Sequence, residues 1–188
     1  TAAAVMSRML KGDKDTLTIQ IKGEGPMGGI VAVTDSRANV RGYVHNPDVY
    51  LPLNEKGKID VSGALGPNGY LNVIKDMGLK EPYIGYVNLV SGEIAEDIAY
   101  YFANSEQVPS IVALGVLIDA DGSILNSGGY IIQLMPGANE EMISFLEEKA
   151  ASMPPVTSLL AEGKKPEEIL DIALGEKGVE ILDTAPCR

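Results

Sequence analysis

The sequence predicts an α+β fold, with a largely antiparallel sheet core covered by helices and followed by a small all-helical unit. Three observations support this fold class. Short segments that alternate apolar and polar side chains recur up to about residue 136, and a period of two is typical of half-buried strands. Glycine, proline and aspartate residues that favour turns separate these segments. Beyond residue 136 the apolar period becomes helical, so we place a domain boundary at 136/137.

Seven segments before this boundary have the composition of strands. Residues 16–21 alternate strictly, whereas 111–118 and 130–135 are longer apolar runs on either side of an Asp-Gly pair at 121–122. An Asp-Gly pair between two apolar runs favours a β-hairpin. The predicted strands comprise residues 16–21, 29–33, 40–44, 70–74, 83–89, 111–118 and 130–135.

Two helices are predicted among these strands. Residues 2–10 contain strong helix formers. The segment 93–104 places Ile98, Tyr101 and other apolar residues at helical spacing, and Ser91 is a candidate N-cap. We expect this second helix to cover one face of the sheet.

The segment 137–188 is predicted to hold short helices with an acidic surface. Asn139 and Thr157 are candidate N-caps of the first two helices, and Pro166 suits the first turn of the third. Eleven acidic residues and only four basic ones lie between 137 and 183. Either a solvated helix surface or an interaction surface would explain this charge.

The overall composition argues against several classes of partner. A formal net charge of −11 without a basic patch disfavours nucleic acid and anionic membranes. No stretch approaches the roughly 20 unbroken apolar residues that span a bilayer. The single cysteine, Cys187, excludes an internal disulfide framework and suits a reducing cytosol. We therefore expect a cytoplasmic chain that binds neither nucleic acid nor membrane.

No motif points to catalysis. Gly23, Gly25 and Gly28 match the dinucleotide pattern G-x-G-x-x-G, but a strand is predicted after them, where that pattern needs a helix. His45 is the only histidine, so neither a catalytic triad nor a zinc site within this chain is expected. We predict that the protein is not an enzyme and has no catalytic residues. A small-molecule enzyme with a site not visible in the sequence and a passive protein-interaction domain are the alternatives.

Several segments resemble consecutive segments of one known family. The most specific are Ser105-Glu106-Gln107-Val108-Pro109-Ser110 and Gly128-Gly129-Tyr130-Ile131-Ile132-Gln133-Leu134-Met135-Pro136. The others are 23–29, 40–44, 46–47, 66–69, 73–76 and 90–94. Through these segments the sequence resembles the heat shock protein 33 family, also called the 33 kDa chaperonin. The match covers essentially the whole chain, in order and with the spacing of the family.

The resemblance implies a redox-regulated holding chaperone, or holdase, that works without ATP. Such a protein binds unfolding or oxidatively damaged proteins and prevents their aggregation under oxidative and heat stress. The family also implies a cytoplasmic homodimer and four C-terminal cysteines, which bind zinc when reduced and form disulfide bonds when oxidised. Those cysteines would follow Arg188, so zinc is expected in the full-length protein and no cofactor in this chain. Cys187 stands where the family more often has an apolar residue, so we do not expect it to be a ligand.

In terms of this family, residues 1–136 would be a sheet-rich chaperone core, and 137–188 an acidic helical linker that leads to the zinc-binding module. The predicted client-binding residues are the apolar residues of the linker. Because their helical spacing is equally that of core residues, core packing is the competing interpretation. These residues are Met142, Ile143, Leu146, Leu159, Leu160, Ile169 and Leu170.

Overall fold

The structure, a computed structural model, describes residues 1–55, 57–119 and 121–186. The chain forms two compact units, Ala2–Pro109 and Ser110–Ala185. We call them the sheet unit and the hairpin unit. Both units mix strands and helices, and every neighbouring pair of described strands is antiparallel, which confirms the predicted α+β class.

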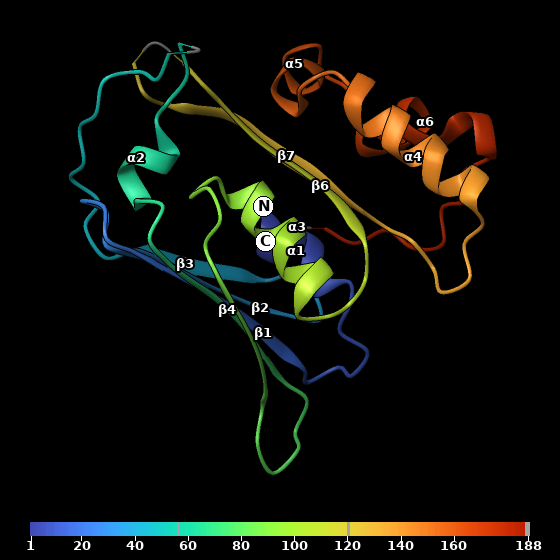
Figure 1. Ribbon diagram of the computed structural model, residues 1–188, viewed down its shortest axis with the longest axis horizontal. Coiled ribbons are helices and arrows are strands. Elements are labelled where there is room, and N and C mark those ends of the chain that lie inside the picture. Colours follow the sequence, from blue (N-terminus) through green and yellow to red (C-terminus); the bar gives the residue numbers. More distant parts are fainter. Residues whose placement is uncertain (56, 120, 187–188) are drawn as a thin grey trace. The chain divides into compact units, whose positions relative to one another are not determined.

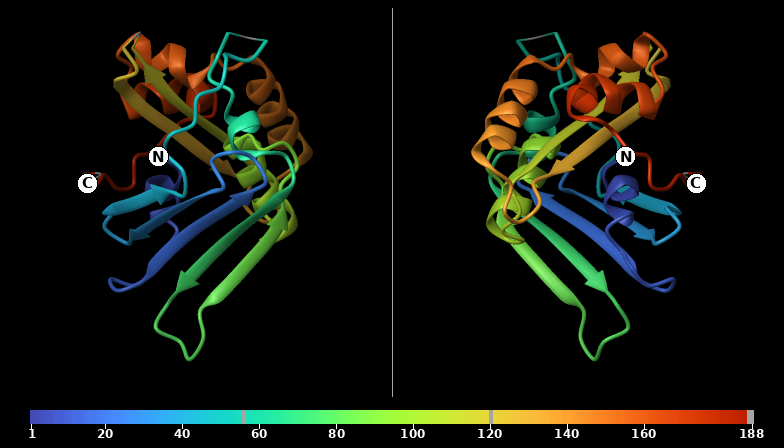
Figure 2. Two further views of the ribbon diagram at one scale, coloured as in Figure 1. Left: turned by 90° about the vertical axis from the view of Figure 1, so that its left-hand side faces the viewer. Right: turned by 90° about the vertical axis from the view of Figure 1, so that its right-hand side faces the viewer.

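The sheet unit contains a five-stranded sheet in the order β3-β2-β1-β4-β5 (Figures 1 and 2). The chain builds one side of the sheet with two consecutive hairpins and then returns to add β4 and β5 on the other side of β1. Its elements are α1 (Ala2–Ser7), β1 (Thr16–Gly23), β2 (Gly29–Asp35), β3 (Val40–Val44), α2 (Val61–Leu65), β4 (Gly69–Asp76), β5 (Tyr83–Asn88) and α3 (Ile94–Asn104).

The register of the central strand explains why one face of the sheet is buried. Leu17, Ile19 and Ile21 of β1 are buried, and the residues between them are only half-buried. Ile19 lies opposite Ala32 of β2 and Val73 of β4, so apolar side chains line up across the strands on the same face. This alignment follows from the alternation in the sequence, because successive side chains of a strand point to opposite faces.

Helices α1 and α3 pack on the sheet. Helix α1 contacts β1 and β2, and α3 contacts β4 and β5. Ile98, Tyr101 and Phe102 of α3 have no exposed surface. The predicted N-cap was wrong: Glu93 occupies that position, and the Ser91 hydroxyl accepts a hydrogen bond from the Glu93 N–H at 3.1 Å.

The three glycines of the G-x-G-x-x-G pattern form a strand-to-strand turn, as predicted. They also allow a close contact with α2, a helix that the sequence analysis did not predict. The N–H of Gly25 donates to the Leu65 carbonyl at 2.7 Å. A Cβ on Gly23 would lie 1.9 Å from that same oxygen, so only glycine fits there. Gly28 adopts a φ of 74°, which also favours glycine.

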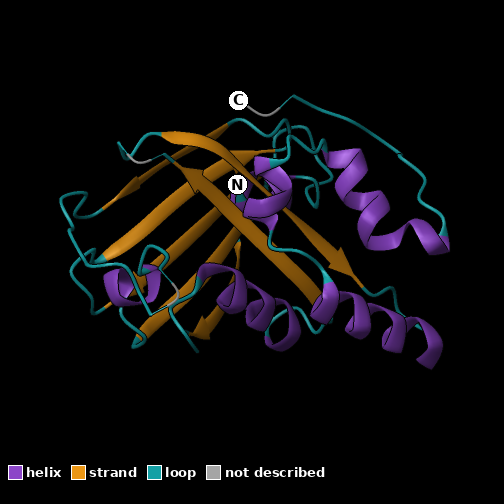
Figure 3. Ribbon diagram, turned by 90° about the horizontal axis from the view of Figure 1, so that it is seen from above, coloured by secondary structure: helices purple, strands orange, loops and turns teal. Residues whose placement is uncertain are grey.

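The hairpin unit consists of a long β-hairpin and the helices that follow it (Figures 1 and 3). Strand β6 pairs with β7 over almost their whole lengths, with an irregularity at Leu117 and Ile118. Helix α5 contacts both strands. The elements of this unit are β6 (Ser110–Ile118), β7 (Ile124–Gln133), α4 (Glu140–Ser152), α5 (Val156–Ala161), α6 (Pro166–Leu174) and the 3-10 helix η1 (Gly175–Lys177).

The two compact units meet at 109/110, whereas the sequence analysis drew the boundary at 136/137. The hairpin belongs with the helices because its apolar side chains pack against α5 and α6 rather than forming part of the five-stranded sheet. A change from strand period to helix period marks a change of secondary structure, and here both kinds of element share one core. The functional division into a chaperone core and a linker stays a prediction.

Candidate binding surfaces

The seven predicted client-binding residues all lie in the helices of the hairpin unit, and none is exposed. Leu146, Leu159 and Ile169 are buried, with 3–7 % of their surface exposed. The other four, Met142, Ile143, Leu160 and Leu170, are half-buried. In this folded state an unfolded client would not reach most of these side chains.

Three of the seven residues belong to one apolar cluster on the hairpin. Leu159 and Ile169 pack with Tyr130 of β7 and Val156 of α5, and Leu160 lies at the edge of the cluster. Burial raises the pKa of the Tyr130 hydroxyl, as expected for a phenol in apolar surroundings. The competing interpretation of these residues as core is therefore correct for the folded state, and client contact would require the helices to separate from the hairpin.

The outer face of the five-stranded sheet is the second candidate surface. Val33, Tyr43, Ile84 and Tyr86 project from it and keep 39–61 % of their surface exposed. Val33, Ile84 and Tyr86 occupy strand positions next to buried ones, and Tyr43 lies opposite Val31, which shares the face of Val33. The side of the sheet opposite α1 and α3 therefore carries all four. These residues were not among the client-binding residues predicted from the sequence, although the period of two within the predicted strands was a usable signal for one shared face.

Uncharged polar residues lie in the middle of this outer face. In the central strand, Thr18 and Gln20 alternate with the buried residues, and Gln20 lies opposite Asn72 of β4. The rings of Tyr70 and Tyr86 are 5.7 Å apart between their centroids. The outer face therefore combines aromatic and aliphatic side chains with neutral hydrogen-bonding groups, and Arg41, which lies opposite Val33, adds a positive charge on β3.

A charged cluster ties the beginning of α4 to η1 in the hairpin unit. Lys177 donates to Glu141 at 2.7 Å, and Lys149 donates to Glu176 at 2.5 Å. Both ammonium groups also lie over the Phe145 ring, at 5.1 and 5.5 Å from its centroid. We call these five residues the Phe145 clasp. The hydrogen bonds from the lysines hold the pKa values of Glu141 and Glu176 below their ordinary range.

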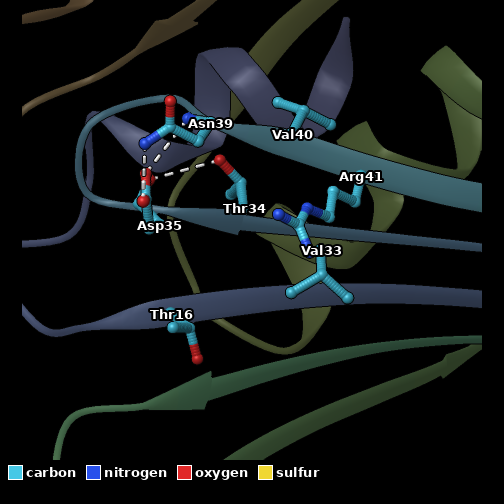
Figure 4. Close-up of a pocket in the computed structure, with 7 residues that line it drawn as sticks. All are labelled: Thr16, Val33, Thr34, Asp35, Asn39, Val40 and Arg41. Carbon is cyan, nitrogen blue, oxygen red and sulfur yellow. Dashed lines mark hydrogen bonds between the residues drawn. The ribbon is translucent and has the colours of Figure 1, made fainter. Parts of the chain in front are cut away.

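A shallow depression of about 460 Å³ at the end of β1, β2 and β3 does not have the properties of an active site (Figure 4). Its one carboxylate, Asp35, accepts hydrogen bonds from the Asn39 side chain at 2.7 Å and from the backbone of Asn39 and Arg37. The bonds from Asn39 keep the pKa of Asp35 low. This carboxylate stabilises the turn between β2 and β3, so it is not available as a general base.

Other predicted features can now be located. His45 stacks on Tyr43, with ring centroids 5.8 Å apart. Among the described residues, no group of three or more histidine, cysteine, aspartate or glutamate side chains could hold a metal ion. Cys187 lies outside the described residues. The helices that the structure describes include none that is long and apolar enough to cross a membrane.

Comparison with known proteins decides the family. The family model described as Hsp33 protein matches residues 1–188. The chain belongs to the Hsp33 family. The heat shock protein 33 resemblance found in the sequence is therefore confirmed.

Curated Hsp33 relatives and a solved Hsp33 structure agree with this assignment. The chain is 62 % identical to the 33 kDa chaperonin of Acetivibrio thermocellus over 188 residues, all of this chain and 63 % of that protein. It is also 62 % identical to the 33 kDa chaperonin of Ruminiclostridium cellulolyticum over 187 residues, 63 % of that protein.

The crystal structure of the 33 kDa chaperonin (heat shock protein 33 homolog) from Thermotoga maritima has the same fold. It matches with a TM-score of 0.86 and 44 % identity, over 93 % of this chain and 59 % of that one. The chain thus spans less than two thirds of the length of these Hsp33 relatives.

Proposed function

We propose that this chain contains the client-binding part of an ATP-independent holding chaperone, which binds unfolding proteins and keeps them from aggregating. The observation that carries the proposal is the exposed outer face of the sheet, with Tyr43, Ile84 and Tyr86 more than half exposed in a folded unit. Exposed apolar surface of this kind marks an interaction site. The relatives named 33 kDa chaperonin support the same role.

The hairpin unit would supply a second, conditional client surface. Its seven predicted residues are covered in the folded state, and they would become available when α4, α5 and α6 loosen from the hairpin. Covering one large apolar side chain contributes roughly 1.5–3 kcal/mol, so the closed state is the default. The acidic surface of these helices would keep the opened form soluble.

Redox control belongs to the full-length protein in this proposal. Zinc bound by cysteines that follow Arg188 would hold the linker helices in place, and oxidation would release them. Cytoplasmic location, homodimer formation and the lack of enzymatic activity are parts of the same proposal.

The first experiment measures light scattering by a chemically denatured client enzyme as it is diluted into buffer, with this chain present and no oxidant added. We expect scattering to fall as the chain reaches several-fold molar excess, because the outer face is exposed without any trigger. An equal mass of an inert protein serves as the control. Unchanged scattering at every ratio would overturn the proposal.

A matched pair of variants tests the conditional surface. Ile143→Ser removes a half-buried apolar side chain of α4, and Glu147→Ser changes an exposed residue of the same helix. We expect amide exchange across 138–153 to accelerate only in Ile143→Ser. If these residues bind clients, client affinity should also fall in that variant alone. Faster exchange with unchanged or improved holding would assign client binding to the outer face of the sheet instead.

A further inference from the structure

Strand β5 forms one edge of the five-stranded sheet (Figure 2). Its six residues, Tyr83–Asn88, carry no charge and no proline. Native sheets commonly protect an edge with charged residues, proline or a bulge, because an open edge pairs readily with another extended chain. The opposite edge, β3, is shorter and carries Arg41. The β5 edge therefore lacks the usual protection.

The backbone of β5 presents a row of free hydrogen-bonding groups at this edge. The N–H of Leu89 donates to the Gly69 carbonyl at 3.0 Å, which fixes the side of the strand that faces β4. Because backbone groups alternate in direction along a strand, Ile84, Tyr86 and Asn88 point their N–H and C=O groups away from β4. Within the described part of the sheet unit, these groups have no hydrogen-bond partner.

The side chains of the same three residues lie on the outer face. Ile84 and Tyr86 are 58 % and 54 % exposed, and Asn88 is also exposed. The Tyr86 hydroxyl donates to the Asn88 side chain at 2.8 Å. A strand added beside β5 would thus gain main-chain hydrogen bonds at the edge and apolar contacts on the outer face at once.

We propose that an extended segment of an unfolded client adds to the β5 edge as a sixth strand. This inference rests on the proposed holding function and specifies how the client is held. Main-chain pairing suits a chaperone that must accept many sequences, because every residue except proline has the same donor and acceptor. The absence of charge along β5 also lets an apolar client segment pair without desolvating an ionic group.

The edge fits an unfolded client better than a folded partner. Folded partners rarely offer an unpaired strand, whereas an unfolding protein exposes extended segments together with their apolar side chains. Every second side chain of the added client strand would lie on the outer face beside Ile84 and Tyr86. Binding should therefore favour client segments rich in aromatic and β-branched residues, which pack well against these two side chains. A second copy of this chain is the remaining occupant that the experiment must separate.

The decisive experiment compares two dye-labelled peptides with identical side chains. One is an ordinary extended peptide rich in valine and tyrosine, and the other is N-methylated at alternate backbone positions so that one edge cannot donate. Binding to the unaltered chain is followed by fluorescence anisotropy. We expect the methylated peptide to bind at least about tenfold more weakly, since several hydrogen bonds of roughly 1 kcal/mol each are lost. Equal affinity for both peptides would overturn the inference.

A pair of variants tests the same edge from the side of the chain. Tyr86→Pro removes an N–H that points away from β4, so the β4–β5 pairing can remain. Tyr86→Thr removes the ring and keeps the N–H. We expect Tyr86→Pro to weaken binding of the unmethylated peptide more than Tyr86→Thr does, because it removes the N–H as well as the ring, but by less than methylation, which removes several hydrogen bonds. An equal loss in both variants would mean that the ring, and not the edge, binds.

Amide hydrogen exchange locates the contact without any substitution. We expect the amides of Ile84, Tyr86 and Asn88 to become protected when the unmethylated peptide is added, at constant chain concentration. The contrary result would be protection of these amides that rises with chain concentration when no peptide is present. It would overturn the inference and indicate that two copies of the chain pair at this edge. If the chain holds clients while both peptides bind alike, only this inference fails. If it neither holds clients nor binds a peptide, the proposed function fails as well.

Discussion

At the scale of single residues, a partly buried polar contact connects α3 to β4. Tyr101 has no exposed surface, and its hydroxyl donates to Glu106, which also pairs with Lys75. Burial and the bond to Glu106 raise the pKa of Tyr101, so this phenol stays neutral at any physiological pH. A Cβ on Gly85 would lie only 2.6 Å from the Tyr101 ring. Any larger residue at this strand position would therefore have to displace the ring.

Substitution of Gly85 measures that constraint. Gly85→Ala should lower the free energy of unfolding by about 1–3 kcal/mol, because the ring of Tyr101 is fully buried and has no free space to enter. Urea unfolding provides the measurement. The neighbouring Ile84→Thr, at an exposed position, should change the same free energy by less than about 1 kcal/mol. Equal effects of the two substitutions would contradict the packing argument.

At the scale of secondary-structure elements, the Phe145 clasp joins the first helix of the hairpin unit to η1. Both carboxylates of the clasp are well exposed, so each ion pair alone adds little stability. Both lysines lie over the Phe145 ring, so the two ion pairs are next to each other. Together they connect α4 to η1, which lies much later in the chain. The clasp is thus sensitive to the charge state of Glu141 and Glu176.

Acid should open the clasp. The pKa values of Glu141 and Glu176 lie below their ordinary value of 4.5 in the folded chain, so their contribution is fully present above that pH. It is lost as the pH falls below 4.5 through the folded-state values. We expect amide exchange in α4 and η1 to accelerate in this window after correction for intrinsic rates. Lys177→Met removes one ion pair and one cation over the ring, so it should accelerate exchange modestly already at pH 7. A salt concentration of about 1 M should reproduce part of this effect.

The sequence predicted most elements and missed those that depend on distant contacts. Strand β1 was recognisable because its apolar residues alternate, and α6 because Pro166 starts it and an apolar spacing follows. Helix α2 is five residues long and contains Gly63, so no periodicity could reveal it. The seven linker residues were located correctly on helices, but apolar spacing alone does not tell a permanent core from one that opens. The β5 edge follows from strand order, which long-range pairing determines.

At the scale of the whole molecule, the two units differ in how completely they bury their cores. Residues of the sheet unit such as Leu71, Val73 and Ile98 have no exposed surface. In the hairpin unit the best-covered large side chain, Leu159, retains 3 %. A smaller and less completely covered core opens more readily, so local unfolding should begin in the hairpin unit.

Denaturant unfolding should therefore have two steps. Leu159→Ala should move only the first step and Leu71→Ala only the second, each by about 2–5 kcal/mol, because each leaves a cavity in one core. Hydrogen exchange with mass spectrometry assigns each step to its unit. A single step that both substitutions shift equally would show that the units unfold together.

The packing of α5 against β6 and β7 also affects how this chain can evolve by mutation. Gly115 and Gly128 lie opposite each other, and a Cβ at either would come within 3.0–3.1 Å of Val156, Thr157 or Leu160. Every glycine codon becomes an alanine codon by one nucleotide change. A variant with altered packing between α5 and the hairpin is thus a single mutational step away and needs no change in the helices themselves. Natural selection can therefore alter how tightly α5 packs on the hairpin at these two codons.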